Sequence, residues 1–407
     1  MNESDPSNAD PLDWERAADY VHELRADRLP HQGLERVPID RIGGRTLAES
    51  IDAPESIPNH SYATMDGFAF DAAEEYPLRI VDGVFPEDTP GHLGDGEAVR
   101  IATGAPLPES ATAVLRREDA TVEGNRLRGP DIAPGTYVYE RASNVAEGER
   151  LFSAGDRLSP KDALLLGDLG IDDVTVYRPF DVATLATGTE LHEGRQRDLD
   201  SPMLAGLVRN WGHDVTHEGT VPDEFGRVRD VIADVANEYD VVVTTGGTSV
   251  GKKDHVVRAL EDLGEVIFHR VALRPGKPIA VARLEEYDAV VFAIPGKPVG
   301  AHAVTALVVR PFFTASSSLP TVTATVDVDL EVTTPGFTYA VPVTLSAGRA
   351  MPLGHVESPL SVYDGTFDPS VLSSSSRATR AAGFVLTERG LSAGETVSVV
   401  PYEVVER

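Results

Sequence analysis

The stretch from Val241 to Asp254 limits the fold of this chain more than any other part of the sequence. It opens with three valines and two threonines, and a β-branched run of this kind is typical of a strand buried on both faces of a parallel sheet. The run leads into Gly246-Gly247 and then Gly251, where the backbone can turn sharply and approach a ligand. A helix is expected from Val256 onward. Since a glycine-rich turn before a helix presents free N–H groups, the stretch predicts an anion site in an α/β sheet.

Lysines gather around this turn. The chain has only five lysines, and four of them, Lys252, Lys253, Lys277 and Lys297, lie within residues 252–297. The formal net charge is −29, so a local group of cations favours binding of phosphate or another oxyanion. A solvated basic surface is the alternative interpretation, and it stays open at this point.

Length and composition exclude several classes of protein. A chain of 407 residues is long enough for about two to four domains. The 65 acidic against 36 basic residues argue against a nucleic-acid partner, and the absence of cysteine excludes disulfides and cysteine-ligated zinc. The N-terminal residues do not resemble a signal peptide, and no apolar run approaches the roughly 18 residues of a membrane span. We expect a soluble, cytoplasmic protein without a membrane partner.

The acidic excess also suggests a halophilic protein. Arginine far outnumbers lysine, and the acids are spread along the whole chain. Concentrated salt would screen their mutual repulsion. Full stability in a refolding titration without added salt would contradict this hypothesis.

Patterning predicts four domains, for a multidomain α/β plus β fold class. Residues 12–50 and 146–177 read as one discontinuous connector domain. Residues 51–145, where Pro, Gly and acids recur every few positions, predict a β-rich domain. Residues 178–314 alternate strands and helices, which predicts a doubly wound α/β domain. Residues 320–407 alternate apolar and polar side chains, which predicts a small C-terminal β-barrel or sandwich.

Polar side chains follow four predicted strands of the α/β domain. The four segments are 187–190, 222–224, 246–254 and 295–298. Ligands of such sheets bind beyond the carboxyl ends of the parallel strands. We therefore expect these side chains to converge at one edge of the sheet.

The residue types at these ends point to a particular chemistry. Glu190, Asp223 and Asp254 are suited to sharing a hard divalent ion such as Mg²⁺. Arg274 and Lys277 lie in a rigid Arg-Pro-Gly-Lys-Pro turn and are suited to an oxyanion. A metal beside such cations predicts phosphoryl or nucleotidyl chemistry. Each acid also has a structural reading, as the start of a loop, a helix N-cap or an acidic first turn.

Six ordered motifs together resemble one known family. Two of them, around Asp66-Gly67 and Thr103-Gly104, would pass for ordinary turns if they stood alone. The order and rough spacing of all six are similar to those of the molybdopterin molybdotransferases, the MoeA or gephyrin E-domain family, and the resemblance covers about residues 12–407. The motifs are Thr64-Met65-Asp66-Gly67-Phe68-Ala69, Arg100-Ile101-Ala102-Thr103-Gly104-Ala105-Pro106, Ala186-Thr187-Gly188-Thr189-Glu190-Leu191, Thr244-Thr245-Gly246-Gly247-Thr248-Ser249-Val250-Gly251 with Asp254, Arg274-Pro275-Gly276-Lys277-Pro278 and Pro295-Gly296-Lys297-Pro298.

The resemblance implies an architecture and a reaction. It implies an L-shaped homodimer of four-domain subunits, with a MogA-like central domain and the discontinuous domain at the dimer interface. It implies that adenylylated molybdopterin and molybdate are converted, with Mg²⁺, into molybdenum cofactor with release of AMP. Further partners that it implies are a molybdopterin adenylyltransferase and the apoproteins of molybdoenzymes.

The resemblance also implies the site residues. The β-rich domain of one subunit would face the MogA-like domain of the other, so that Asp66 and Thr103 complete a catalytic site formed by Glu190, Asp223 and Asp254. The last three would be the metal ligands. The cofactor-binding residues that it implies are Thr187, Gly188, Ser201, Gly246, Gly247, Ser249, Gly251, Arg274, Lys277, Pro295, Gly296, Lys297 and Pro298.

Four positions depart from the usual pattern of the family. Thr189 stands where an Asp is usual, and Pro202 where an Asn is usual. Lys297 and Gly300 stand in place of an Asn and a Ser. These departures leave two alternatives open: a paralogue that uses tungstate, and a non-catalytic molybdopterin carrier or scaffold. A MogA-like adenylyltransferase is disfavoured, because it would need only the central domain.

Overall fold

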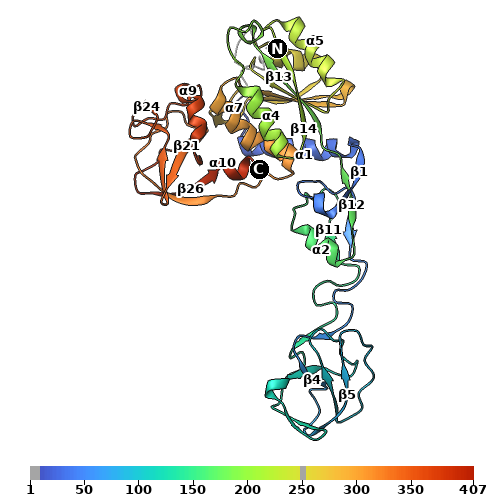
Figure 1. Ribbon diagram of the computed structural model, residues 1–407. Coiled ribbons are helices and arrows are strands. Elements are labelled where there is room, and N and C mark those ends of the chain that lie inside the picture. The colour runs from blue at the N-terminus through green and yellow to red at the C-terminus, as the bar shows by residue number, and fades with distance from the viewer. Residues whose placement is uncertain (1–9, 248–253) are drawn as a thin grey trace, which may run out of the picture. The chain divides into compact units, whose positions relative to one another are not determined.

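The structure is a computed structural model that describes residues 10–247 and 254–407, and the chain divides into two compact units (Figure 1). One unit comprises Met1–Glu35, Gly44–Thr46 and Val176–Arg407, and the other Arg36–Gly43 and Leu47–Thr175. The boundaries of the four expected domains stay a prediction. No helix in the described parts of the chain is long and apolar enough to cross a membrane.

A six-stranded sheet forms the centre of the first unit. Its order is β14-β13-β15-β19-β18-β16. Neighbouring strands are parallel except where β18 pairs with β19 and β16, so β18 alone runs against the other five. The strands are β13 (Asp181–Thr187), β14 (Asp214–Val221), β15 (Val241–Thr245), β16 (Glu265–His269), β18 (Ala280–Leu284) and β19 (Ala289–Ile294).

Helices cover both faces of this sheet, which explains the unbroken apolar run of β15. Val241 and Val243 belong to one core cluster, with residues of α1, α4 and α7, whereas Val242 belongs to a second, with residues of α5 and α6. Figure 1 shows α4 and α7 on one side of the sheet and α5 on the other. The predicted doubly wound α/β domain is therefore confirmed. Its helices are α1 (Trp14–Arg28), α3 (Thr189–His192), α4 (Asp200–Asn210), α5 (Phe225–Ala236), α6 (His255–Leu263), α7 (Pro298–Val304) and α8 (Arg310–Thr314), the last two joined by a π-helical turn (Thr305–Val309).

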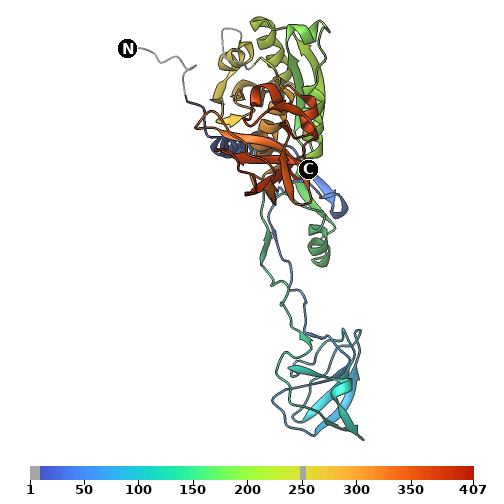
Figure 2. The ribbon, with the colours of Figure 1, turned by 90° about the vertical axis from the view of Figure 1, so that its left-hand side faces the viewer.

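The C-terminal part of the first unit is a closed barrel. The sheet order β21-β22-β20-β26-β25 closes on itself, because β25 also pairs with β21. Of the two expected forms, barrel and sandwich, the structure has the barrel, whose closure leaves no free edge in this ring. Its core residues belong to the same cluster as one face of the α/β domain, and the barrel is the orange and red part of the ribbon in Figure 2. The elements are β17 (Leu273–Arg274), β20 (Val322–Val326), β21 (Thr338–Ser346), β22 (Arg349–Pro352), β23 (Gly354–His355), β24 (Ser361–Tyr363), β25 (Gly383–Thr387), β26 (Thr396–Pro401), α9 (Pro369–Leu372) and α10 (Tyr402–Val405).

The second unit contains a six-stranded sheet of order β7-β4-β6-β5-β9-β8, as the β-rich pattern predicted. Gly67 begins β4 directly after Asp66, and a Cβ there would lie 2.0 Å from the carbonyl oxygen of Leu115 on β7. Only glycine permits this close pairing. The strands are β4 (Gly67–Phe70), β5 (Leu78–Val84), β6 (Glu97–Ile101), β7 (Ala113–Arg116), β8 (Thr121–Glu123) and β9 (Arg126–Arg128). Smaller elements are β1 (Leu34–Pro38), β2 (Ile51–Asp52), β3 (Tyr62–Ala63), β10 (Val138–Tyr139), β11 (Arg150–Phe152), β12 (Asp173–Tyr177) and α2 (Asp162–Asp168).

Candidate active site

The carboxyl ends of β13, β14, β15 and β19 meet at one edge of the sheet, as the strand-end argument predicted. They surround a cavity of about 260 Å³. Eight residues singled out from the sequence line it, which are Thr187, Gly188, Glu190, Asp223, Gly246, Gly247, Gly296 and Pro298. The parallel order of these strands is what places segments so distant in the sequence around one cavity.

Glycines form the tightly packed floor of this cavity. Gly246 and Gly247 have φ values of +85° and +66°, a region that other residues rarely adopt. A Cβ on Gly246 would lie 2.6 Å from the carbonyl oxygen of Thr187, and one on Gly296 would lie 3.1 Å from the Cα of Gly246. The loops after β13, β15 and β19 are thus in backbone contact. No side chain projects from these glycines, so a ligand in the cavity would meet the main chain directly.

Two acids to which the sequence reasoning gave no role also line this cavity, although one of them, Asp200, belongs to the Asp200-Ser201-Pro202 segment that the family resemblance covers. They are Asp198 and Asp200, beside the predicted Glu190 and Asp223. They follow β13 only after an intervening loop, so a search limited to the residues directly after each strand does not reach them. Three oxygens, Asp198 Oδ2, Asp200 Oδ1 and Asp223 Oδ1, are buried without a hydrogen-bond partner among the described residues. Unpaired buried oxygens of this kind need a donor or a cation.

Asp200 is the most deeply buried of these acids. It is 7% exposed, and its Oδ2 accepts a hydrogen bond of 3.3 Å from Thr245 Oγ1. Burial raises the pKa of Asp200 to about 6, although the hydrogen bond from Thr245 opposes the shift. Asp198 accepts hydrogen bonds from the backbone N–H groups of Asp200 and Ser201, both 3.1 Å long. The predicted Ser201 is buried at the start of α4 and does not line the cavity.

Asp254 lies outside the lining of this cavity. Its Oδ1 caps α6 by accepting a 3.2 Å hydrogen bond from the N–H of Val257. Burial raises the pKa of Asp254 to about 6, and the like charge of Asp223 adds to the shift. Its Oδ2 is 3.8 Å from Nε2 of His269, whose pKa burial lowers to about 4, so this imidazole is neutral at neutral pH.

Glu190, Asp223 and Asp254, the three expected metal ligands, do not form a ready-made metal site. No group of three His, Cys, Asp or Glu side chains within residues 10–247 and 254–407 is arranged to hold a metal ion by itself. Glu190 and Asp223 share the cavity, while the carboxylate of Asp254 is engaged by its own helix. Metal binding by these three residues therefore stays a prediction.

Replacing Asp254 with Asn should stabilise the metal-free protein at neutral pH. The pKa of Asp254 in the folded state, about 6, lies above its ordinary value of 3.8, so the ionised carboxylate costs folding energy above pH 6. That cost is relieved as the pH falls through 6 and disappears below 3.8. Asn keeps the helix cap without the charge. We expect a gain of about 1–2 kcal/mol at neutral pH, allowing for solvent screening, that shrinks towards acidic pH.

Urea unfolding between neutral pH and about pH 5 measures this difference. The matched control replaces the exposed Glu286, which lies on another segment of the same unit, with Gln, and this change should alter stability little at any pH. A pH-independent difference for the Asp254 variant, or a loss of stability at neutral pH, would contradict the prediction.

Cations line a second cavity that shares its floor with the first. This cavity, of about 500 Å³, is lined by Arg274, Lys277 and Lys297 together with Gly246, Gly247, Pro295 and Gly296. Gly246, Gly247 and Gly296 also line the acidic cavity. The first unit thus holds two adjacent cavities, one acidic and one cationic, that share three lining glycines.

The C-terminal barrel completes the cationic cavity, which sequence reasoning did not foresee. Ser370 and Ser373 line this cavity, and Lys297 Nζ donates a 3.2 Å hydrogen bond to the carbonyl oxygen of Ser370. The Arg274 guanidinium lies 4.3 Å, and Lys277 Nζ 5.4 Å, from the ring centre of Phe337.

Arg274 and Lys277 are partly withdrawn from water, whereas Lys297 is exposed. Burial lowers the pKa of Lys277, and the neighbouring charges of Arg270 and Arg274 lower it further. Desolvated cations bind anions more strongly than exposed ones.

Four of the sequence-predicted residues, Ser249, Gly251, Lys252 and Lys253, lie outside the described residues.

The Asp66 and Thr103 turns meet in the second unit. The backbone N–H and the Oγ1 hydroxyl of Thr103 donate to Asp66 Oδ1, over 2.7 and 2.8 Å. These two hydrogen bonds lower the pKa of Asp66, so the exposed carboxylate is ionised at neutral pH. Asp66 also lines a cavity of about 590 Å³ with Arg100 and Arg117.

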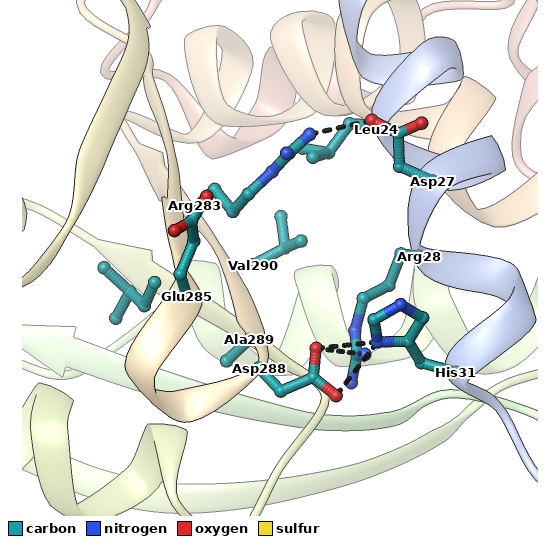
Figure 3. Close-up of a pocket in the computed structure, with 10 residues that line it drawn as sticks. Leu24, Asp27, Arg28, His31, Arg283, Glu285, Asp288, Ala289 and Val290 are labelled. Atoms are coloured by element: carbon teal, nitrogen blue, oxygen red, sulfur yellow. Dashed lines mark hydrogen bonds and ion pairs between the residues drawn. The ribbon is translucent and has the colours of Figure 1, made fainter.

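A further cavity of about 340 Å³ lies between the end of α1 and the β18–β19 hairpin, near the opposite edge of the α/β sheet. Figure 3 shows that its charged side chains pair with one another. Arg28 lies 2.7 Å from Asp288, His31 lies 3.0 Å from Asp288, and Arg283 lies 2.9 Å from Asp27. This cavity therefore reads as a structural tie between α1 and the sheet.

Comparison with known families matches most of the chain. The family described as "MoeA N-terminal region (domain I and II)" matches residues 14–170. The family described as "Probable molybdopterin binding domain" matches residues 183–315, which include residues of both cavities.

Similar proteins point to the same family. The chain is 31% identical over 307 residues to a molybdopterin molybdenumtransferase from Synechococcus elongatus, covering 69% of this chain and 75% of the relative. It is 27% identical to gephyrin from Dictyostelium discoideum, over 65% of this chain and 44% of gephyrin. The crystal structure of the molybdopterin biosynthesis MoeA protein from Pyrococcus horikoshii is similar with a TM-score of 0.69 and 28% identity, over 96% of this chain and 99% of that one. The chain therefore belongs to the molybdopterin molybdenumtransferase family, the family of MoeA and gephyrin.

Proposed function

We propose that this protein is a molybdopterin molybdenumtransferase of molybdenum cofactor biosynthesis. In this proposal, molybdate is inserted into adenylylated molybdopterin with Mg²⁺, and AMP is released. The observation that carries the proposal is the pair of adjacent cavities, one acidic and one cationic, that share Gly246, Gly247 and Gly296. Such a site suits a substrate with hydrogen-bond donors at one end and anionic groups at the other. The activity named for the Synechococcus elongatus relative supports the same conclusion.

Glu190 and Asp223 fit a Mg²⁺ ion. Asp223 contributes a buried Oδ1 without a partner among the described residues, and Mg²⁺ commonly takes one or two carboxylates, with water and phosphate oxygens completing its shell. Asp254 would join them only after giving up or sharing its helix cap. When bound, Mg²⁺ would offset negative charge on the phosphoanhydride.

Side chains and backbone groups of the two cavities would bind the substrate and stabilise the charge on the leaving group. Arg274 and Lys277 would bind the anionic groups of the substrate and stabilise the charge that develops as AMP leaves. Gly246 and Gly296 pack too closely for a side chain, so the main chain itself lines the site at these positions. The barrel residue Ser370 holds the Lys297 ammonium beside this site.

Turnover with defined substrates tests the proposal. Adenylylated molybdopterin and Mg²⁺ are supplied with either molybdate or tungstate, and AMP release and cofactor formation are followed in the salt in which the protein is folded. We expect AMP release coupled to molybdenum insertion. A clear preference for tungstate would instead indicate the tungstate paralogue, and no turnover with either oxyanion would indicate a carrier or scaffold.

A homodimer is the second part of the proposal. The family resemblance implies that the exposed, ionised Asp66, held by Thr103, serves the site of a second protomer, and we infer the same arrangement here. Asp66→Ala and Asp223→Asn chains should each be inactive alone. Co-expression should restore about a quarter of the wild-type activity, since half of the dimers are mixed and each mixed dimer keeps one intact site. No recovery in isolated mixed dimers would contradict the arrangement in trans.

A further inference from the structure

We propose that Asp200 recognises the pterin ring, its carboxylate accepting hydrogen bonds from the 2-amino group and from N3–H. The inference rests on the proposed function, because it takes molybdopterin as the substrate. It gives a specificity-determining role to a residue that had none in the sequence analysis, and it assigns the direction in which the substrate lies in the site.

The state of Asp200 itself is the first argument. The residue lines the acidic cavity, is 7% exposed, and its Oδ1 has no hydrogen-bond partner among the described residues. Its other oxygen is held by Thr245 Oγ1 at 3.3 Å. A buried carboxylate that is oriented but half satisfied carries an energetic cost that a ligand with donors would remove.

The geometry of the pterin supplies the second argument. Its 2-amino-4-oxopyrimidine edge presents two N–H donors side by side, and a carboxylate accepts such a pair in a bidentate manner. The neighbouring Asp198 has a second unpaired oxygen, Oδ2, in the same cavity wall. A metal ion is the competing occupant of this cavity, so the test below is made without metal.

Charge along the site then sets the direction of the substrate. The dithiolene and phosphate of molybdopterin are anionic and lie at the end of the molecule away from the pterin amino group. Arg274 and Lys277 line the cationic cavity beyond Gly246 and Gly247. With the amino edge of the pterin at Asp200, the dithiolene extends towards the cations, where the oxyanion is expected.

Binding of two matched pteridines tests the inference without metal, molybdate or adenylate. The probes are 6-hydroxymethylpterin and 6-hydroxymethyllumazine. The pterin has an amino group at C2, and the lumazine has a carbonyl oxygen at the same position. Their intrinsic fluorescence reports binding at about pH 7.5, where the Asp200 carboxylate is ionised. We expect the wild-type protein to bind the pterin at least about tenfold more tightly, because lumazine turns an acceptor towards the carboxylate.

The Asp200→Asn variant should reverse this preference. Its carboxamide accepts from N3–H and donates to the lumazine carbonyl, so lumazine should become the tighter ligand by about tenfold. A role of Asp200 in folding alone would not exchange one specificity for the other. The matched control, Asp214→Asn at the exposed start of β14, should keep the wild-type ratio.

Several results would overturn the inference. Equal binding of the two probes by the wild-type protein does so whether or not the variant folds, and so does a pterin preference that survives in Asp200→Asn. Failure of both probes to bind at about 1 mM, an affinity near −4 kcal/mol, also counts against it. Loss of molybdenum insertion with an intact pterin preference would instead refute only the proposed function.

Discussion

Replacing Asp223 with Asn is expected to lower the rate of molybdenum insertion by about a thousandfold while leaving the protein folded. Asp223 follows β14 at the active edge of the sheet, shares the acidic cavity with Glu190, and has a buried Oδ1 without a described partner. Asn has nearly the same shape but no negative charge, so it should weaken Mg²⁺ binding. Folding should not suffer, because the change removes a buried charge without leaving a new one unpaired.

The measurement is AMP release over a titration of Mg²⁺, together with thermal unfolding of the metal-free protein. Asp214, at the other end of the same strand, provides the matched control as Asp214→Asn, and its rate should stay near that of the wild type. A wild-type rate and Mg²⁺ requirement in Asp223→Asn would remove Asp223 from the reaction and with it the proposed metal position.

Replacing Lys277 with Met should have the second largest effect, a fall of about a hundredfold in the rate at low molybdate. Lys277 is half-buried where it lines the cationic cavity, and burial together with the charges of Arg270 and Arg274 lowers its pKa. Met keeps the length and apolar stem of the side chain. The lost contact with Phe337 should cost no more than about 1 kcal/mol of stability.

Initial rates over a series of molybdate concentrations separate weaker oxyanion binding from slower chemistry. We expect most of the effect as a higher molybdate concentration at half-maximal rate, with a smaller change in the maximal rate. Lys161→Met, which removes a lysine of the second unit ahead of α2, is the matched control. If the molybdate dependence of Lys277→Met matches that of the wild type, the cationic cavity does not bind the oxyanion through this residue.

Local residue patterns were enough to predict much of the fold. The β-branched run of β15 could only be a strand covered on both faces, and the structure packs Val241 and Val242 into separate cores on opposite sides of the sheet. Glycine after the strand was equally informative, since Gly246 and Gly247 adopt left-handed backbone angles at the cavity floor. The acidic and cationic residues at the strand ends followed from the parallel order of the sheet.

Other parts of the site could not be predicted from the neighbouring sequence. Asp254 fits both a helix-cap and a metal-ligand reading in sequence, and its hydrogen bond to the N–H of Val257 shows that the cap is made. Asp198 and Asp200 follow a loop rather than a strand end, yet they line the same cavity as Asp223. The barrel brings Phe337 next to the cations of the α/β domain.

The sequence by itself determined the elements of this protein, because strand and helix periodicity and glycine conformation depend on neighbouring residues. Only the tertiary structure decided which acids share a cavity and which barrel residues face Arg274 and Lys277. Those contacts join segments far apart in the chain, and they exist only once the strand order of the sheet and the closure of the barrel have placed the loops together.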